Sequence, residues 1–188
     1  MPHVLVLYGT TDGHTAKIAS VLRNTLMAEG SSVEAMDARH LTDDARPEEY
    51  DGVIVAASIH ARGYQRAVKR WVASHASALN ARPSAFVSVC LGILEQRAEA
   101  QREVREIMDR FLADAGWHPA VRLPVAGALP YTRYSWWKKW AMKRIVARAG
   151  GDTDTTRDFE YTDWDALGAF AREFGGRISG VATAGAVS

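Results

Sequence analysis

The chain has little of what defines several protein classes. Its 188 residues contain one cysteine, Cys90, so no internal disulfide can form, which fits a reducing cytoplasm. No apolar run reaches the roughly 18 residues that a membrane span needs, and the first residues lead directly into a strand pattern rather than a signal peptide. The formal net charge is only +1, so overall charge selects no partner. We therefore expect a cytoplasmic globular protein in which any membrane contact is peripheral.

Strand-like runs alternate with helix-like periodicity along most of the chain. Strands buried on both faces read as continuous apolar runs, and strands are predicted at 4–8, 32–36, 53–57, 85–89 and 121–128. Apolar residues at helical spacing predict helices at 15–29, 64–79, 95–115 and 163–178. Such alternation predicts a parallel sheet with helices on both faces. We expect a flavodoxin-like, doubly wound α/β fold with five parallel strands in the order 2-1-3-4-5.

These elements predict one domain, residues 1–178, with one long insertion. Residues 131–160 lie between the fifth strand and the last helix, and they exceed the length of an ordinary loop. Residues 179–188 are mostly glycine, alanine, serine and valine. We expect this last segment to be a flexible tail.

The loop between the first strand and the first helix carries the strongest chemical signal. Free backbone N–H groups and the helix dipole favour an anion at such a helix start. The chain lacks the lysine of a nucleoside triphosphate loop and the Gly-x-Gly-x-x-Gly pattern of a dinucleotide site. We therefore predict a site for one monophosphate group, the alternative being a turn that only caps the helix. The loop residues are Thr10, Thr11, Asp12, Gly13, His14 and Thr15.

Three further loops leave the carboxyl ends of strands three, four and five, where ligands bind in this fold. Rings and a cation stand in the first of them, whereas the second is aliphatic apart from Cys90. No cation adjoins Cys90 in the sequence, so we expect a buried, unreactive thiol. The candidate binding residues are Ser58, Ile59, His60, Ala61, Arg62, Gly63 and Tyr64, then Val89, Cys90, Leu91 and Gly92, and finally Gly127 and Ala128.

The insertion combines cations with aromatic rings, and residues 131–149 contain no acid. This composition suits a membrane–water interface, a large anionic substrate, or rings that simply pack against the domain. Nucleic acid is the least favoured partner. The residues concerned are Arg133, Lys138, Lys139, Lys143, Arg144, Arg148, Tyr131, Tyr134, Trp136, Trp137 and Trp140.

With these residues in view, the chain resembles the flavodoxin-like, menaquinone-dependent protoporphyrinogen IX oxidases (dehydrogenases) of haem biosynthesis. The resemblance covers roughly residues 3–175. The phosphate loop is generic to flavodoxins, whereas the insertion and its end are the specific part. The specific stretches are Gly150-Gly151-Asp152-Thr153-Asp154-Thr155 and Tyr161-Thr162-Asp163-Trp164.

The resemblance implies FMN as cofactor, held by the four loops, with the loops after strands three and four on either side of its ring. It also implies protoporphyrinogen IX as substrate, menaquinone or ubiquinone as electron acceptor, and peripheral contact with the anionic inner face of the cell membrane. No metal ligand and no catalytic side chain are assigned, and a homo-oligomer is one option for the assembly. His60 and Arg62 are candidates for tuning the flavin or for holding a propionate.

Two alternatives stay open at this point. A flavodoxin-type electron carrier would need no basic, aromatic insertion, and an NAD(P)H-dependent quinone reductase would turn over without porphyrinogen. Flavodoxins commonly stack aromatic side chains on both flavin faces, but here the loop after strand three offers the rings of His60 and Tyr64, whereas the loop after strand four offers only aliphatic residues. Because Arg62 and His60 stand where acidic flavodoxins carry negative charge, we expect a flavin that accepts electrons more readily.

Overall fold

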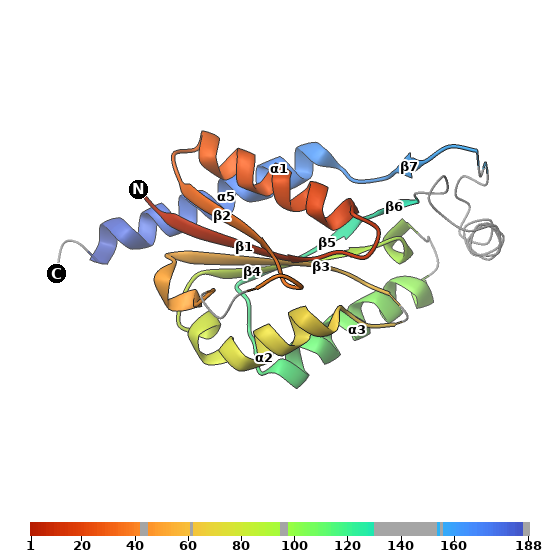
Figure 1. Cartoon of the computed structure of the whole chain (residues 1–188), viewed down its shortest axis with the longest axis horizontal. Helices are drawn as coiled ribbons and strands as arrows, with labels where there is room; N and C mark the ends of the chain where they lie inside the picture. The colour runs from red at the N-terminus through yellow and green to blue at the C-terminus, as the bar shows by residue number, and fades with distance from the viewer. Residues whose placement is uncertain (42–44, 61, 95–97, 130–153, 155, 186–188) are drawn as a thin grey trace.

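A five-stranded parallel sheet forms the centre of the molecule, in the order β2-β1-β3-β4-β5 (Figure 1). The computed structural model describes residues 1–41, 45–60, 62–94, 98–129, 154 and 156–185. The strand order confirms the predicted flavodoxin-like arrangement. The strands are β1 (His3–Gly9), β2 (Ser32–Asp37), β3 (Gly52–Ser58), β4 (Ser84–Cys90) and β5 (Val121–Ala126).

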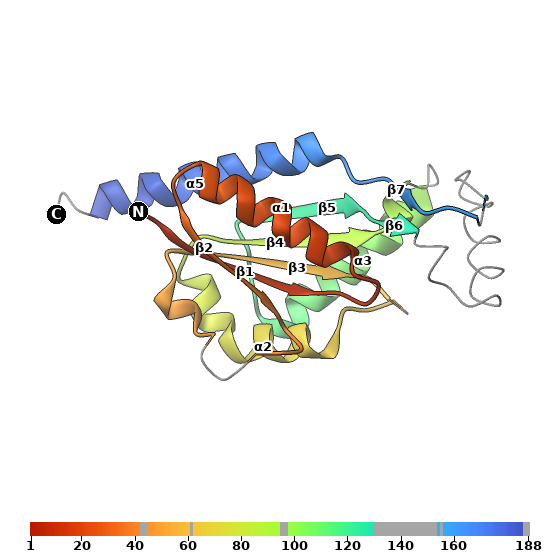
Figure 2. The ribbon, with the colours of Figure 1, turned by 45° about the horizontal axis from the view of Figure 1, so that its top comes forward.

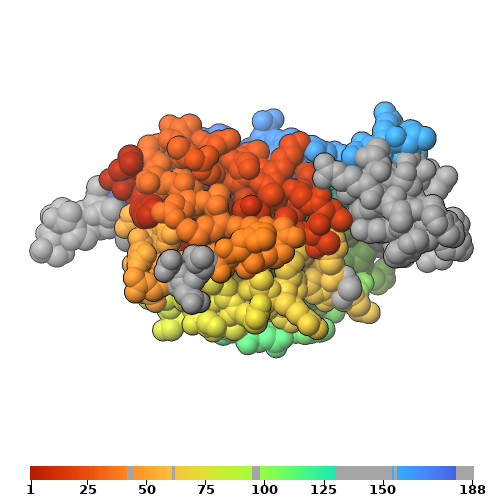
Figure 3. All heavy atoms as spheres, viewed as in Figure 1, coloured from red at the N-terminus to blue at the C-terminus, as the bar shows by residue number. Residues whose placement is uncertain are grey.

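Two helices cover each face of the sheet (Figures 1 and 2). Helices α1 (His14–Ala28) and α5 (Trp164–Gly185) lie together on one face, and α2 (Arg66–Asn80) and α3 (Ala98–Ala115) lie on the other. Short 3-10 turns, η1 (Pro47–Glu49) and η2 (Gly92–Leu94), precede β3 and α3. In the space-filling view, the first strand–helix–strand unit lies directly against α2 (Figure 3).

The continuous apolar strands follow from this two-sided covering. Val4 and Val6 of β1 belong to the core beneath α1 and α5, whereas Leu5 and Leu7 belong to the core beneath α2 and α3. All four side chains are fully buried. Because successive side chains of a strand point to opposite faces, a strand covered on both sides needs apolar residues at every position.

The last helix is longer than the sequence suggests. The predicted end at residue 178 is wrong, because α5 continues to Gly185 and takes in much of the expected tail. Ile178 is buried and packs where a side chain on Gly52 would collide with it, so the helix is still docked on the sheet there. Gly175 and Gly180 lack the left-handed backbone angles that commonly end a helix.

The starts of three helices also differ from the sequence prediction by a few residues. Helix α1 begins at His14 rather than at residue 15. Helix α2 begins at Arg66 rather than at Tyr64, because Tyr64 turns into the core. Helix α3 begins at Ala98 after a 3-10 turn, and residues 95–97 lie outside the described part of the chain. Asp163 caps the start of α5, since its carboxylate accepts the Ala166 N–H at 2.9 Å.

The fifth strand does not run to residue 128 as predicted. It ends at Ala126, and Gly127 then lets the chain leave the parallel sheet. A two-residue strand, β6 (Ala128–Leu129), pairs antiparallel with β7 (Phe159–Glu160), which returns from the insertion. This ladder joins the two ends of the insertion at the carboxyl edge of the sheet. We call residues 159–164 the return stem; the insertion residues 131–153, which include every cation and ring named above, lie outside the described residues.

Candidate functional site

A hollow of about 380 Å³ opens at the carboxyl edge of the sheet, where the sequence analysis places the ligand. Four predicted loops and one helix contribute to its wall. The predicted residues that line it are Thr10, Asp12, His14, Thr15, Ser58, Ile59, His60, Arg62, Val89, Cys90, Leu91, Gly92, Gly127 and Ala128.

Some of the predicted binding residues do not line the hollow, and the sequence prediction missed one part of its wall. Thr11, Gly13, Gly63 and Tyr64 are not among the lining residues, and Ala61 lies outside the described part of the chain. The missed wall comes from the first turns of α3. A helix that starts at the carboxyl edge necessarily brings its first turns there, which is the signal that could have found it. Its lining residues are Ala100, Glu103, Val104 and Ile107.

The loop between β1 and α1 leaves the start of α1 without a capping side chain. Gly13 takes left-handed angles, with φ at 91°, and its N–H donates to the Thr10 hydroxyl oxygen at 2.9 Å. No side chain caps α1 and no acid stands in its first turn. The first N–H groups of a helix have no acceptor within the helix. They are therefore available, with the buried Thr15, to bind a negatively charged group.

The loop after β3 brings a ring and a cation to the rim. His60 and Gly63 exchange backbone hydrogen bonds of 2.8 and 3.0 Å, which close a tight turn with Arg62 in the left-handed region at φ 63°. The exposed guanidinium of Arg62 is 2.9 Å from a carboxylate oxygen of Glu103 on α3. The cation predicted from the sequence is therefore paired with an acid that lies 41 residues away.

Tyr64 does not face the hollow. Its ring packs edge-on against Phe86 at 5.1 Å and lies 4.9 Å from the ring of Phe111. Its hydroxyl forms a 2.7 Å hydrogen bond with that of Ser88, and burial raises the pKa of the phenol. Two rings were expected over the ligand. That of His60 lines the hollow, whereas that of Tyr64 does not.

Cys90 lies in the wall of the hollow as a buried, free thiol. Burial raises its pKa, although the N–H groups of Ile93 and Gly92 act in the opposite direction. A thiol with a raised pKa is mostly protonated near neutral pH and is a poor nucleophile. The geometry therefore agrees with the prediction of an unreactive side chain.

The first turn of α1 also holds the return stem of the insertion. The His14 Nε2 atom is 2.7 Å from the Thr162 hydroxyl oxygen, and that hydroxyl donates to the Ala126 carbonyl at 2.6 Å. Because the single hydroxyl proton of Thr162 is used there, His14 must be the donor, so its neutral form carries the proton on Nε2. The His14 and Trp164 rings lie 5.7 Å apart.

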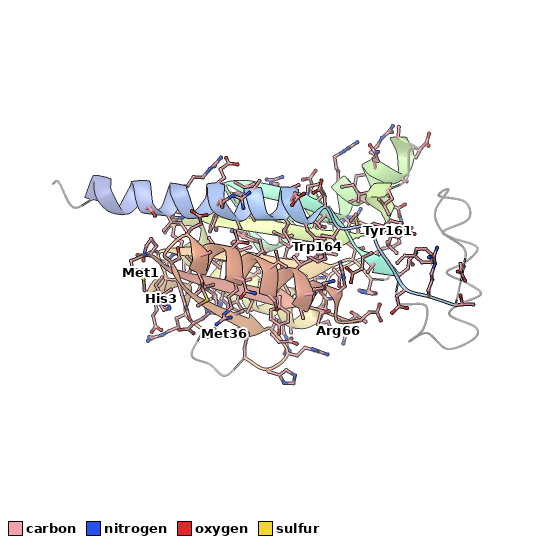
Figure 4. The ribbon with its side chains drawn as sticks, turned by 90° about the horizontal axis from the view of Figure 1, so that it is seen from above. Met1, His3, Met36, Arg66, Tyr161 and Trp164 are labelled. Atoms are coloured by element: carbon pink, nitrogen blue, oxygen red, sulfur yellow. The ribbon has the colours of Figure 1, made fainter. Side chains whose placement is uncertain are left out.

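A second residue of α1 strengthens this contact. The Lys17 ammonium donates to both carboxylate oxygens of Glu160, at 2.8 and 2.6 Å, and lies 4.8 Å from the centre of the Trp164 ring. Figure 4 shows Tyr161 and Trp164 where the return stem enters α5, beside α1. We call the contacts of His14 and Lys17 with the return stem the α1–stem latch. It places the end of the insertion next to the phosphate loop.

The latch predicts a pH-dependent contribution to stability. Burial is the main cause that lowers the pKa of His14, while the Glu160 carboxylate opposes it and Lys17 adds to it. The folded protein therefore resists protonation of His14 more than the unfolded chain does. The stabilisation by neutral His14 is complete above the unfolded pKa of about 6.5 and is lost as pH falls from there through the lower pKa of the folded state. We expect the difference in unfolding free energy between wild type and His14→Gln to shrink between about pH 8 and pH 5.

Denaturant titrations of the two apoproteins across this range measure that difference. Arg23→Gln, an exposed change on the same helix, serves as the control and should show a difference that is flat with pH. A difference for His14→Gln that is equally flat would contradict a neutral, desolvated histidine in the latch.

Two negative findings concern the part of the chain that the structure describes. None of its helices combines the length and the apolar character needed to cross a bilayer. Within the same residues, no group of three or more histidine, cysteine, aspartate and glutamate side chains gathers as a metal ion would require.

Comparisons with known proteins place the chain among flavin proteins. A flavodoxin-domain family model matches residues 5–156. The chain is 36% identical over 169 residues to "Protoporphyrinogen IX dehydrogenase [quinone]" of Escherichia coli (strain K12), which spans 90% of this chain and 92% of the relative. The protein of the same description from Leishmania major is 33% identical over 175 residues, spanning 92% and 74%.

Solved structures agree on the fold. An oxidised flavodoxin 1 from Bacillus cereus has a TM-score of 0.56 at 14% identity, covering 92% of this chain and 96% of its own. A short-chain flavodoxin associated with a bacterial microcompartment has a TM-score of 0.58 at 15% identity, covering 95% and 99%. The family model and the curated relatives carry the assignment further than these fold matches do. The chain belongs to the flavodoxin-domain family and, within it, to the group of the quinone-dependent protoporphyrinogen IX dehydrogenases.

Proposed function

We propose that this protein oxidises protoporphyrinogen IX to protoporphyrin IX in haem biosynthesis, with FMN in the hollow and a quinone as electron acceptor. The observation that carries the proposal is the 36% identity over 90% of the chain. The family model, which matches residues 5–156, includes all four loops of the hollow. The reaction removes six electrons and six protons from the substrate. Each quinone takes up two of each, so three quinones become quinols for every porphyrin formed.

The residues of the hollow fit a flavin mononucleotide. One phosphate group matches one uncapped helix start, with Thr10 and Thr15 as hydroxyl donors and Gly13 allowing close backbone approach. A flavin supplies the exchange of electron pairs between substrate and quinone. Beyond the phosphate loop, the aliphatic side chains of Leu91 and Val89 give the hollow an apolar wall that suits a ring.

The chain's own residues then bind, orient and shield. His60 and Arg62 stand at the rim, where a cation can hold a carboxylate group of the substrate. Val104 and Ile107 of α3 give the adjoining wall an apolar surface that excludes water. No described side chain is assigned as an acid or base, so the proposed role of the protein is positioning.

Contact with an anionic membrane is part of the proposal and rests on the sequence. A quinone acceptor of this type is lipid-soluble, and the cations and rings of residues 131–149 suit the surface that holds it. A peripheral location at the inner face of the cell membrane follows from this reasoning, while a homo-oligomer stays a prediction.

The test is an anaerobic assay of the purified protein loaded with FMN. Protoporphyrinogen IX and a menaquinone analogue are added, and porphyrin fluorescence is followed. We expect fluorescence to rise only when protein and quinone are both present. Turnover with NAD(P)H and quinone but none with porphyrinogen would favour the reductase alternative, and flavin reduction without either reaction would favour the electron carrier.

The paired charges at the rim predict opposite changes in flavin potential. A cation stabilises the anionic reduced flavin and an acid destabilises it, so Arg62→Glu should lower the two-electron midpoint and Glu103→Gln should raise it. The pair is exposed, so each shift should be small, about 10 to 30 mV. Redox titration of the FMN-loaded variants measures this, with Arg110→Gln as an exposed control on α3. Unchanged midpoints in both variants would remove the pair from this role.

A further inference from the structure

Gln65 connects the phosphate loop with the end of β3, although it does not line the hollow. It directly precedes α2, and its side-chain amide nitrogen donates to the Ser58 hydroxyl oxygen at 2.8 Å and to the Thr11 hydroxyl oxygen at 3.2 Å. Ser58 lines the hollow, and Thr11 lies between two residues that do. One amide therefore contacts both segments that border the predicted phosphate site.

The two hydrogen bonds decide where the hydroxyl protons can go. An amide nitrogen carries two protons, and a hydroxyl carries one proton and can also accept. When Gln65 donates to Thr11 and to Ser58, each hydroxyl acts as an acceptor and keeps its own O–H free to donate. A hydroxyl that accepts one hydrogen bond is also polarised into a better donor.

The other end of the amide has no partner. The Gln65 Oε1 atom is the one buried side-chain nitrogen or oxygen without a hydrogen bond in the part of the chain that the structure describes. It lies against Gly9, where any side chain would come within 2.9 Å of it. Rotating the Gln65 amide by 180° would exchange its oxygen and nitrogen and would bury two unpaired N–H donors in place of one unpaired acceptor. The free-energy cost of that orientation is higher. The observed orientation of the Gln65 amide is therefore the more stable one, although the unpaired Oε1 atom still lowers the stability of the fold.

We propose that Gln65 is a positioning residue that holds the Ser58 hydroxyl as a donor to the phosphate of the bound flavin and fixes the phosphate loop through Thr11. The inference rests on the proposed function, because it takes FMN as the ligand. A buried polar group that stays unpaired costs stability, and such groups in native proteins call for a functional reason. Here the unpaired acceptor accompanies an arrangement that leaves the O–H of Ser58, which lines the hollow, free to donate.

The proposal predicts a change in the choice between two flavins. FMN and riboflavin share the ring and the ribityl chain, and riboflavin lacks the phosphate. Gln65→Met keeps the length of the side chain and removes the amide, so FMN should bind about tenfold more weakly, which is the loss of roughly one hydrogen bond to a charged group. Riboflavin affinity should change less than about twofold. Quenching of flavin fluorescence on titration with apoprotein measures both constants.

Two further measurements separate this role from simple packing. The apoprotein of Gln65→Met should unfold close to the wild-type temperature, because the variant loses two hydrogen bonds but also removes an unpaired buried acceptor. Gln65→Glu should weaken FMN more than Gln65→Met does, because a carboxylate accepts both hydroxyl protons and repels the phosphate. Its riboflavin affinity should again change little.

Asn80, at the opposite end of α2, provides a matched control. Its amide donates to the Gly116 carbonyl at 2.8 Å and its oxygen accepts the His118 N–H at 2.8 Å. Asn80→Leu should therefore lower the unfolding temperature and leave the ratio of FMN to riboflavin affinity at the wild-type value.

The outcomes are distinct. Equal losses of FMN and riboflavin affinity in Gln65→Met, or no loss of either, would overturn the role of Gln65 while leaving FMN as the cofactor. A wild-type protein that does not prefer FMN over riboflavin would instead overturn the proposed phosphate site. If Gln65→Met does not fold, the same comparison is decided by Gln65→Glu.

Discussion

Replacing residues 136–149 by a short glycine–serine linker should abolish quinone-linked oxidation of protoporphyrinogen and leave FMN bound. Loss of substrate and quinone positioning should lower the rate at least about 100-fold. The flavin site should survive because the ends of the insertion are joined independently of it. Ala128 and Leu129 pair with Glu160 and Phe159, and the α1–stem latch holds the return stem.

The experiment measures FMN affinity, the porphyrinogen oxidation rate and binding to anionic vesicles in the same variant. The deletion removes five of the six cations of residues 131–149, and each contributes roughly 1 kcal/mol near an anionic surface. A second variant, with these five cations replaced by glutamine, keeps the chain length and should lose vesicle binding in a salt-sensitive way. A deletion variant that oxidises porphyrinogen at the full rate would show that the insertion is not needed for function.

The second large effect is expected at the phosphate loop. Thr10→Ala combined with Thr15→Ala should weaken FMN by about 3 to 6 kcal/mol, since each hydrogen bond to a charged group contributes about 1.5 to 3 kcal/mol. Both side chains are buried and both line the hollow. The Thr10 hydroxyl oxygen already accepts the Gly13 N–H, so its proton is free for a phosphate.

Titration of the apoprotein with FMN gives the affinity, and circular dichroism checks that the variant is folded. Thr25→Ala near the far end of α1 is a matched control that should bind FMN as the wild type does. Loss of FMN affinity smaller than about threefold in the double variant would show that the loop is a helix cap and not the phosphate site.

Much of the architecture could be predicted because its signals are local. A strand covered on both faces must be apolar at every position. The continuous apolar runs of β1, β3 and β4, such as Val4 to Leu7, therefore identify these strands in the sequence. A helix start after a buried strand exposes N–H groups whatever the rest of the chain does, so the phosphate loop needs no long-range information. The carboxyl edge as the meeting place of four loops follows from the parallel order alone.

Some predictions failed where small residues carry weak local signals. At Gly127 the chain leaves β5 and enters β6. Other glycines lie within α5, and the helix continues to Gly185. Glycine tolerates helical, extended and left-handed backbone alike. Its sequence context therefore left open which of these the packing would select.

The fold and the edge of the sheet at which the loops meet could be predicted from the sequence, and so could the uncapped helix start expected to bind an anion, since each depends on periodicity or on neighbouring residues. By contrast, the packing of the folded chain places Tyr64 in the core beside Phe86 and leaves His60 on the hollow. The same packing forms the ion pair between Arg62 and Glu103 and the hydrogen bond between His14 and Thr162, which lies 148 residues away. Backbone preference is set within a few residues, whereas the neighbours of a side chain depend on how separate helices and loops pack together.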